Sequence, residues 1–367
     1  MHSDLLLVIV IVAAAAFDFT NGFHDTANVV ASSISTRALS PRTAITLASV
    51  LNFVGAFISL KVAATVATGI IDATQVTETI AFAGLIGAIA WNLLTWAYGL
   101  PSSSSHALIG GVVGAMLAAV GSGGVKFGGL VNKVIVPALI SPVAAFIVAG
   151  LGIIVIYRVF GRRRPGAVTR GFRLGQIVSN SALAIAHGTN DAQKTMGVIT
   201  LALVAHGSLD AKHATVPAWV VVLSATAISL GTYAGGWRII RTVGSRIIKM
   251  DSAQAFSAQA SGAAVILVSS HLGYPLSSTH VISGGVMGAG AAKRLSAVRW
   301  GVAGTIVLAW VITLPTAGLF GAGAYALAAA FGTGVLGPLL ILVIGIGGPV
   351  SMALATRRRR LTETASA

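Results

Sequence analysis

The sequence has no cysteine and very little charge. Without cysteine, the chain of 367 residues can form neither a disulfide framework nor a thiolate metal site. Only 9% of the residues are charged, whereas 55% are hydrophobic, and a soluble chain of this length could not bury so much apolar surface. The apolar runs are continuous and lack the alternation of β-barrel strands. We therefore predict an all-α integral membrane protein.

Acidic residues are scarcer than basic ones, nine against 24, so the net charge is +15. A charge of this size can indicate nucleic-acid binding, but the basic residues here gather in short loops between apolar runs. That distribution is typical of the cytoplasmic loops of membrane proteins. The sequence thus favours the lipid bilayer as a partner and contains no nucleic-acid motif. The basic tail at 357–360 is expected to fix orientation and to contact anionic lipid.

Two short polar stretches lie inside strongly apolar sequence, one in each half. The first contains Gly22 and Asp25, and the second contains Gly188 and Asp191 in the same Gly-x-x-Asp spacing. A carboxylate at membrane depth is costly, so such a residue indicates a functional site by default. The carboxylates offer hard oxygen ligands to a small cation or a transferable proton. The alternative is an acid that only locks helices together, as Asp191 could do with Lys194.

A second motif also occurs twice, beginning at Pro101 and at Pro275. In each copy, serine or threonine residues and a histidine follow the proline and lead into a glycine-rich apolar run. Proline ends the preceding helix and the hydroxyls cap the next one, so free N–H groups gather at a helix start. Such an N-terminus attracts an anion. The candidate anion ligands are Ser103, Ser104, Ser105, Ser277, Ser278 and Thr279. Close helix packing is expected of Gly110, Gly114, Gly284 and Gly288.

The two motifs recur in the same order and at similar spacing, which predicts two copies of one unit. We divide the chain into a first transmembrane repeat at 1–157, a basic cytoplasmic linker at 158–173, a second repeat core at 174–300, and C-terminal helices with a basic tail at 301–367. We expect about 11–12 membrane segments, with broken or re-entrant helices. Each copy has an odd number of crossings, so the repeats are expected to be inverted, as in many secondary transporters.

The basic loops also predict an orientation in the plasma membrane. Placing the linker inside puts nearly every basic cluster on one side of the bilayer. The N-terminus then lies outside and the C-terminus in the cytoplasm. The stretch 61–78 is expected to be an outer loop.

Single polar residues complete the candidate site. Asn28 and Asn190 stand beside the aspartates, whereas Asn52 and Gln259 stand in the middle of apolar runs. These two can line the site or form interhelical hydrogen bonds worth about 0.6 kcal/mol on average. The candidate cation ligands are Asp25, Asn28, Asn52, Asn190, Asp191 and Gln259. Lys194, aligned with Asn28, can contact the anion or hold Asp191, and we favour the second role.

Four histidines lie in or beside the motifs. His106 and His280 end the serine turns, where they can relay protons or, as we favour, bond a nearby carbonyl. His24 and His187 adjoin the Gly-x-x-Asp cores, and we assign them no role.

These motifs resemble those of the inorganic phosphate transporter family. The resemblance rests on the Gly-x-x-Asp cores with Asn28, on the stretch 193–197, and on the two Ser/Thr-His turns, and it spans nearly the whole chain. It implies symport of inorganic phosphate driven by sodium or protons, without a cofactor. It also implies that Asp25, Asp191 and their asparagines belong to the substrate and cation region, with the turn hydroxyls around phosphate. Some members carry glutamate at the positions of Asn52 and Gln259, so the coupling ion and stoichiometry stay open.

The expected function is therefore a phosphate–cation symporter and not an enzyme. Bacterial family members are also described as moving neutral metal–phosphate complexes, and some relatives carry sulfate, so such a carrier is the alternative. A rival from another class is an intramembrane aspartyl hydrolase, with Asp25 and Asp191 sharing a proton. The serine turns do not serve that chemistry. The oligomeric state, including a homo-oligomer, is left open.

Overall fold

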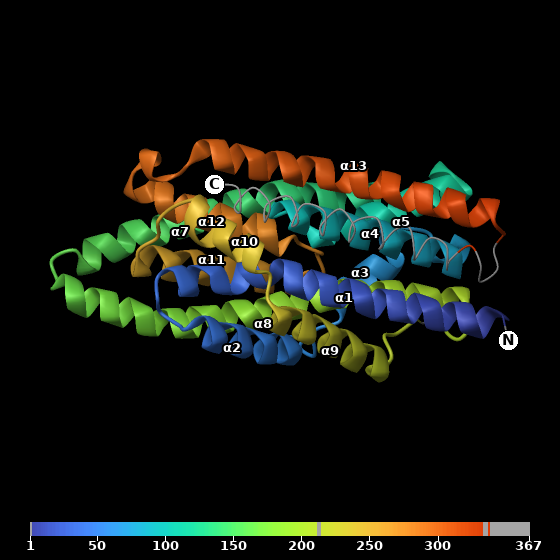
Figure 1. Cartoon of the computed structure of the whole chain (residues 1–367), viewed down its shortest axis with the longest axis horizontal. Coiled ribbons are helices and arrows are strands. Elements are labelled where there is room, and N and C mark those ends of the chain that lie inside the picture. The colour runs from blue at the N-terminus through green and yellow to red at the C-terminus, as the bar shows by residue number, and fades with distance from the viewer. Residues whose placement is uncertain (1, 211–213, 333–336, 338–367) are drawn as a thin grey trace, which may run out of the picture.

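The computed structural model describes residues 2–210, 214–332 and 337. In this part the chain is an elongated bundle of helices without a β-strand (Figure 1), which confirms the all-α prediction. The helices are α1 (His2–Ser35), α2 (Pro41–Gly55), α3 (Lys61–Thr68), α4 (Glu78–Tyr98), α5 (Ser104–Val120), α6 (Phe127–Leu130), α7 (Val136–Phe160), α8 (Pro165–Ala205), α9 (Ala218–Ala234), α10 (Trp237–Arg241), α11 (Ser252–His271), α12 (Ser278–Lys293) and α13 (Trp300–Ala330).

Several segments are long and apolar enough to cross a membrane. Within the described residues these are Asp4–Ser35, Glu78–Tyr98, Phe127–Phe160 and Trp300–Ala330. A further apolar pair, Ala218–Ala234 and Trp237–Arg246, is bent by 59°. Large apolar side chains such as Val311 and Leu319 are exposed on α13, at 68% and 73%, which suits lipid and not water. The number of membrane segments remains a prediction.

The helix breaks occur at the serine turns and not at the Gly-x-x-Asp cores. Both cores lie inside unbroken helices, Asp25 in α1 and Asp191 in α8. The turn at 99–103 joins α4 to α5, and the turn at 272–277 joins α11 to α12. These two helix pairs lie toward opposite ends of the bundle, as Figure 1 shows.

Two stretches expected to be loops are largely helical. The segment 61–78 contains α3 and a short 3-10 turn at Ala73–Gln75. In the basic linker 158–173, α7 continues to Phe160 and α8 already begins at Pro165. Arginine favours helix and proline suits the first helical position, so charge alone does not indicate a loop. The apolar run 335–354, apart from residue 337, and the tail 357–360 lie outside the described residues.

Helices of the two halves contact each other in reciprocal pairs. Helix α1 lies against α9, and α2 lies against α8. A Cβ at Gly22 would overlap the carbonyl of Ile228 on α9, and a Cβ at Gly188 would overlap that of Asn52 on α2. The motif glycines thus permit two backbones to touch.

The glycines after the serine turns have the same role, as predicted. A Cβ at Gly114 on α5 would overlap the carbonyl of Gly318 on α13, and a Cβ at Gly288 on α12 would overlap that of Phe146 on α7. Both contacts join the first repeat at 1–157 to a later part of the chain. Reciprocal contacts of this kind are expected for two copies related by a two-fold axis.

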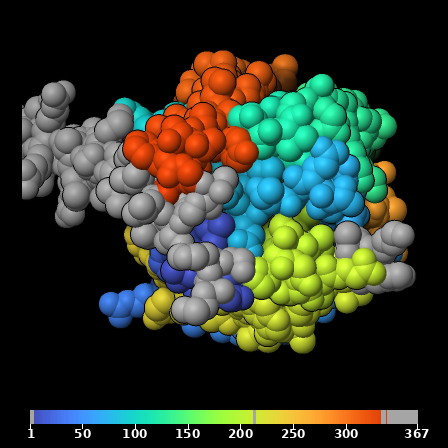
Figure 2. All heavy atoms as spheres, turned by 90° about the vertical axis from the view of Figure 1, so that its right-hand side faces the viewer, coloured from blue at the N-terminus to red at the C-terminus, as the bar shows by residue number. Residues whose placement is uncertain are grey.

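The ends of the bundle are built from both halves. Figure 2 looks onto the end where the N-terminus lies, with the C-terminal ends of α13 and α8 on opposite sides of it. Three clusters of buried apolar residues fill the interior, and the largest combines α1, α4, α5 and α8 with residues of α9. The polar residues of the Gly-x-x-Asp cores and of the serine turns lie among these apolar clusters.

Candidate functional site

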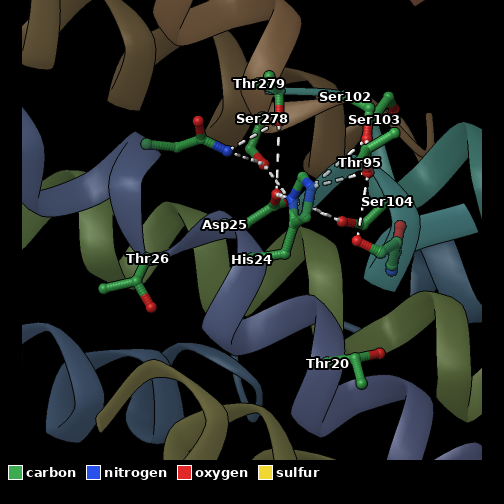
Figure 3. Close-up of polar contacts among 12 residues, drawn as sticks. Thr20, His24, Asp25, Thr26, Thr95, Ser102, Ser103, Ser104, Ser278 and Thr279 are labelled. Atoms are coloured by element: carbon green, nitrogen blue, oxygen red, sulfur yellow. Dashed lines mark hydrogen bonds and ion pairs between the residues drawn. The ribbon is translucent and has the colours of Figure 1, made fainter. Parts of the chain in front are cut away.

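The carboxylate of Asp25 lies where hydroxyls from both serine turns converge. Asp25 as a whole is only 1% exposed. Ser104 Oγ donates to Oδ1 over 3.3 Å, and Ser278 Oγ lies 3.3 Å from Oδ2. Thr279 Oγ1 and His24 Nδ1 lie 3.5 and 2.8 Å from Oδ1 (Figure 3). Ser104 is at the start of α5 and Ser278 at the start of α12, so Asp25 connects the two halves.

Asp191 completes the same cluster from α8. Ser278 Oγ lies 2.9 Å from its Oδ2, so the one hydroxyl faces both carboxylates. The Nε2 atom of His187 also lies 2.8 Å from Oδ2. Within the described residues, Asp25, His187 and Asp191 offer ligand atoms that all lie within 4.8 Å of one another. Two carboxylates and an imidazole at this spacing can hold a cation.

The ammonium of Lys194 is fully buried and ties the cluster together. It forms an ion pair with Asp191, its neighbour one turn earlier on α8. It also donates to Ser105 Oγ over 2.5 Å and to the Leu276 carbonyl over 2.7 Å. The favoured pairing with Asp191 is therefore present. Because Lys194 balances one of the two carboxylates, one negative charge is left, provided that the histidines are neutral.

The serine turns have the capping geometry that the sequence predicts. Ser103 Oγ accepts the N–H of His106 over 3.1 Å at the start of α5. Ser277 Oγ accepts the N–H of His280 over 3.3 Å at the start of α12. Both helix N-termini, with their partial positive charge, thus begin beside the aspartates. Asn28 Nδ2 donates to Thr279 Oγ1 over 2.9 Å and holds the second turn against α1.

Asn190 and Asn52 form hydrogen bonds with groups other than the two carboxylates. Asn190 Nδ2 donates to Ser270 Oγ over 2.8 Å, near the end of α11. Asn52 Oδ1 lies 3.2 Å from Nδ1 of His187, so Asn52 supports the histidine that faces Asp191.

Gln259 belongs to a separate polar cluster. Its Nε2 donates to Ser32 and Ser33 of α1 over 2.8 and 2.6 Å, and its Oε1 accepts from Ser179 of α8 over 2.7 Å. These are interhelical hydrogen bonds, the second of the two roles considered for it.

Sequence reasoning left out two histidines that the structure places in the site. His24 joins Asp25 to the first turn through contacts with Thr95 and Ser102 of 3.3 and 3.4 Å. His187 connects Asn52 with Asp191. The sequence could have indicated the contact of His187 with Asp191, because residues spaced i, i+4 lie on one face of a helix.

The histidines of the two turns lie in another environment. The rings of His106 and His280 contact each other at 4.7 Å, and His280 stacks on Trp310 at 4.2 Å. Nδ1 of His280 lies 3.4 Å from the Ala138 carbonyl, which agrees with the carbonyl contact favoured above. Both rings line an apolar cavity of about 610 Å³.

Comparison with known proteins identifies the family of the chain. The family model described as the phosphate transporter family matches residues 21–321. A relative from Mycobacterium bovis, named "Probable low-affinity inorganic phosphate transporter", is 55% identical over 88% of this chain and 77% of its own length. A relative of the same name from Rhizobium meliloti is 48% identical over 87% of this chain and 96% of its own.

A solved structure shares the fold. It is described as "The sodium-dependent phosphate transporter", and it matches 88% of this chain and 98% of its own with a TM-score of 0.81 and 24% identity. The hydrolase considered above does not agree with these comparisons, because the family and the relatives are transporters and not enzymes. The chain belongs to the phosphate transporter family of multi-pass membrane proteins.

Proposed function

We propose that the protein is a secondary active transporter that carries inorganic phosphate together with a cation, sodium or proton, across the plasma membrane. The family and the names of the relatives support phosphate as the substrate. The solved neighbour is named sodium-dependent, but at 24% identity that likeness concerns the fold. Support for symport therefore comes from the charges and donors of the site.

One observation carries the proposal. Groups that can donate hydrogen bonds to an anion lie beside two carboxylates, and only one of these carboxylates is balanced by a positive charge. The first turns of α5 and α12 bring hydroxyls and helix N-termini to the buried carboxylates of Asp25 and Asp191. Lys194 balances one carboxylate, so the empty pocket is negative and repels phosphate. A cation bound by Asp25, Asp191 and neighbouring oxygens removes that charge. Phosphate and cation then favour each other's binding, which is the thermodynamic basis of coupling.

Most of the predicted ligands keep a direct role in this proposal. Phosphate is bound by the hydroxyls of the two turns, assisted by Asn28 and by Lys194 when it leaves Asp191. The substrate ligands are Ser103, Ser104, Ser105, Ser277, Ser278, Thr279, Asn28, Asp25, Asp191 and Lys194. The cation ligands are Asp25, Asn28, Asn190 and Asp191. Asn52 has an indirect role, because it positions His187. Gln259 is also indirect, because it holds α1 against α8.

Burial of the site suggests how access alternates. Asp25, Asp191, Ser104 and Ser278 are at most 2% exposed, so substrate can enter only when helices move apart. We propose that the two halves are inverted repeats and that one unit moves against the other around the site. The N-terminus then lies outside and the C-terminus in the cytoplasm.

Uptake into liposomes tests the function. Purified protein is reconstituted, and labelled phosphate is offered with an inward sodium gradient or an inward proton gradient. We expect accumulation with at least one gradient and its loss in Asp25→Asn, whereas Asp72→Asn, which changes an acid between α3 and α4, should be unaffected. Gradient-driven uptake by Asp25→Asn at the wild-type rate would contradict the mechanism.

The same assay separates the substrates. A phosphate symporter should be inhibited weakly by excess sulfate, because sulfate is not protonated near neutral pH and cannot donate to a carboxylate. A carrier of metal–phosphate complexes should lose uptake when divalent metal is chelated. Strong inhibition by sulfate would favour the sulfate carrier of the same architecture.

A further inference from the structure

A third buried carboxyl lies apart from the pair that forms the site. Asp18 stands on α1 about two turns before Asp25, on the same helix face, and is 0% exposed. Its Oδ1 accepts a hydrogen bond from Thr195 Oγ1 over 2.5 Å. Among the described residues, its Oδ2 has no hydrogen-bond partner. The phosphate site leaves this group unused.

Ser224 Oγ, beside Asp18, and Asn21 Oδ1, on the same helix, also lack hydrogen-bond partners among the described residues. Ser224 on α9 is a neighbour of the Asp18 carboxyl, and its Oγ has no hydrogen-bond partner in the described part of the chain. Asn21, one turn after Asp18, is 2% exposed, and its Oδ1 likewise lacks a partner among the residues described. A buried polar group left unpaired costs about 1–3 kcal/mol. The unpaired oxygen of Asp18 and the unpaired hydroxyl of Ser224 beside it point to a missing ligand.

The unpaired atoms restrict what this ligand is. Asp18 Oδ2 and Asn21 Oδ1 are acceptors, so the ligand brings a donor hydrogen or a positive charge. Helices α1, α8 and α9 are unbroken here, so their carbonyls are engaged and only a few side-chain oxygens remain. Hard metal ions such as Ca²⁺ and Mg²⁺ take about six or more oxygens. A proton needs only the carboxylate, and the resulting acid can donate to Ser224 or Asn21.

The surrounding charges also favour a proton. Asp191 and Lys194 on α8 are the charged groups that act on Asp18 within the described structure. They form an ion pair with each other, so their effects on Asp18 largely cancel. Helix α9 contributes Ser224 and contains no ionisable residue apart from Tyr233. A carboxylate without a counter-ion is costly at membrane depth, and protonation removes that cost.

We propose that Asp18, held by Thr195 and facing Ser224, is a proton-binding site outside the phosphate pocket, and that its carboxylate takes up a proton on one side of the membrane and releases it on the other. The inference rests on the proposed symport and adds the proton as a coupled ion. Thr195 follows Lys194 directly and lies one turn after Asp191 on α8. A movement of Asp191 when the phosphate site is occupied is therefore transmitted to Asp18 through one turn of α8.

Transport by Asp18→Asn tests the inference. Wild type, Asp18→Asn and the control Asp72→Asn are reconstituted, and two rates are measured: accumulation driven by an inward proton gradient, and phosphate–phosphate exchange without a gradient. We expect Asp18→Asn to lose proton-driven accumulation by about tenfold or more while exchange stays near the wild-type rate. Two results would overturn the inference. One is proton-driven accumulation by Asp18→Asn at the wild-type rate, and the other is a wild-type protein that accumulates phosphate only with a sodium gradient.

A second measurement covers the case in which Asp18→Asn also loses exchange. Infrared difference spectra of the purified protein are recorded as pH is varied, without any transport. A protonated carboxyl band should be present in the wild type, and its pH midpoint should shift in Ser224→Ala, which keeps the acid but removes its neighbour. An unshifted midpoint would reject Asp18 as the site. This readout remains informative even if phosphate uptake itself fails, so the two proposals can fail separately.

Discussion

The carboxylates of Asp25 and Asp191, which come from different halves of the chain, face one shared hydroxyl. Ser278 Oγ lies 3.3 Å from the first carboxylate and 2.9 Å from the second. The hydroxyl belongs to the first turn of α12, so the helix N-terminus is directed at the same point. This is where the motifs of both halves meet.

Ser278→Ala should impair transport strongly. It removes the donor that both carboxylates share, and a hydrogen bond to a charged group is worth about 1.5–3 kcal/mol. We expect phosphate uptake to fall by roughly 10- to 100-fold. Ser283→Ala is the matched control, because Ser283 is buried on the same helix and its Oγ has no partner among the described residues. Equal losses in the two variants would mean that the shared contact is unimportant.

Lys194→Met should destabilise the protein. Removing one partner of a buried ion pair leaves an uncompensated charge and costs about 3–5 kcal/mol. Thermal unfolding in detergent measures the loss, with the exposed Lys126→Met as the control, for which we expect less than about 1 kcal/mol. Adding Asp191→Asn to Lys194→Met should restore part of the stability, because the orphaned charge is then removed. A double variant less stable than Lys194→Met would argue against the pair.

Gly188→Ala should separate α2 from α8. The added methyl would overlap the backbone carbonyl of Asn52, which cannot rotate away as a side chain can. We expect a loss of about 1–3 kcal/mol in unfolding free energy, as for other overpacked sites. Gly304→Ala, on α13, meets nothing within 4 Å and should be neutral or slightly stabilising. A stable Gly188→Ala variant would show that the two backbones do not touch.

Asp251→Ala should lower stability at neutral pH and less so in acid. Asp251 caps α11 and accepts from Tyr157 and Lys293 over 2.9 and 3.1 Å. Partial burial tends to raise the pKa of Asp251, but the N–H of Gln254 and the two side chains outweigh it and hold the pKa below its ordinary value.

A depressed carboxyl pKa stabilises the folded state above the unfolded pKa of about 4, and this contribution disappears as pH falls through the folded pKa. Loss of the cap should cost about 1 kcal/mol at pH 7, measured by thermal unfolding across pH. A difference between wild type and Asp251→Ala that grows toward acid pH would contradict this linkage.

The sequence predicted the helical membrane fold, the two motifs and the capping of both turns, because these depend on local patterns. Continuous apolar runs indicate helices, and hydroxyl residues that follow a proline indicate that a helix begins at each serine turn. The duplicated Gly-x-x-Asp cores indicated that Asp25 and Asp191 are the two carboxylates of the candidate site. The structure places both turns beside them.

The tertiary partners could not be predicted in this way. Gln259 contacts Ser32 and Ser33 because α11, α8 and α1 meet, which no local pattern reveals. Asp18 stands in an apolar run and has no counterpart motif, so only its burial and its unpaired oxygen in the folded chain distinguish it. The helices found in 61–78 and 158–173 show that polar or basic sequence between apolar runs need not be a loop.

The central claim is that one site, made by both halves, holds phosphate and its cation together. An experimental structure determined with phosphate and the coupling cation tests it most directly. The account predicts anion density within hydrogen-bonding distance of the first turns of α5 and α12, with Asp25 close to the cation. Phosphate bound by one half alone, or away from Ser104 and Ser278, would contradict it.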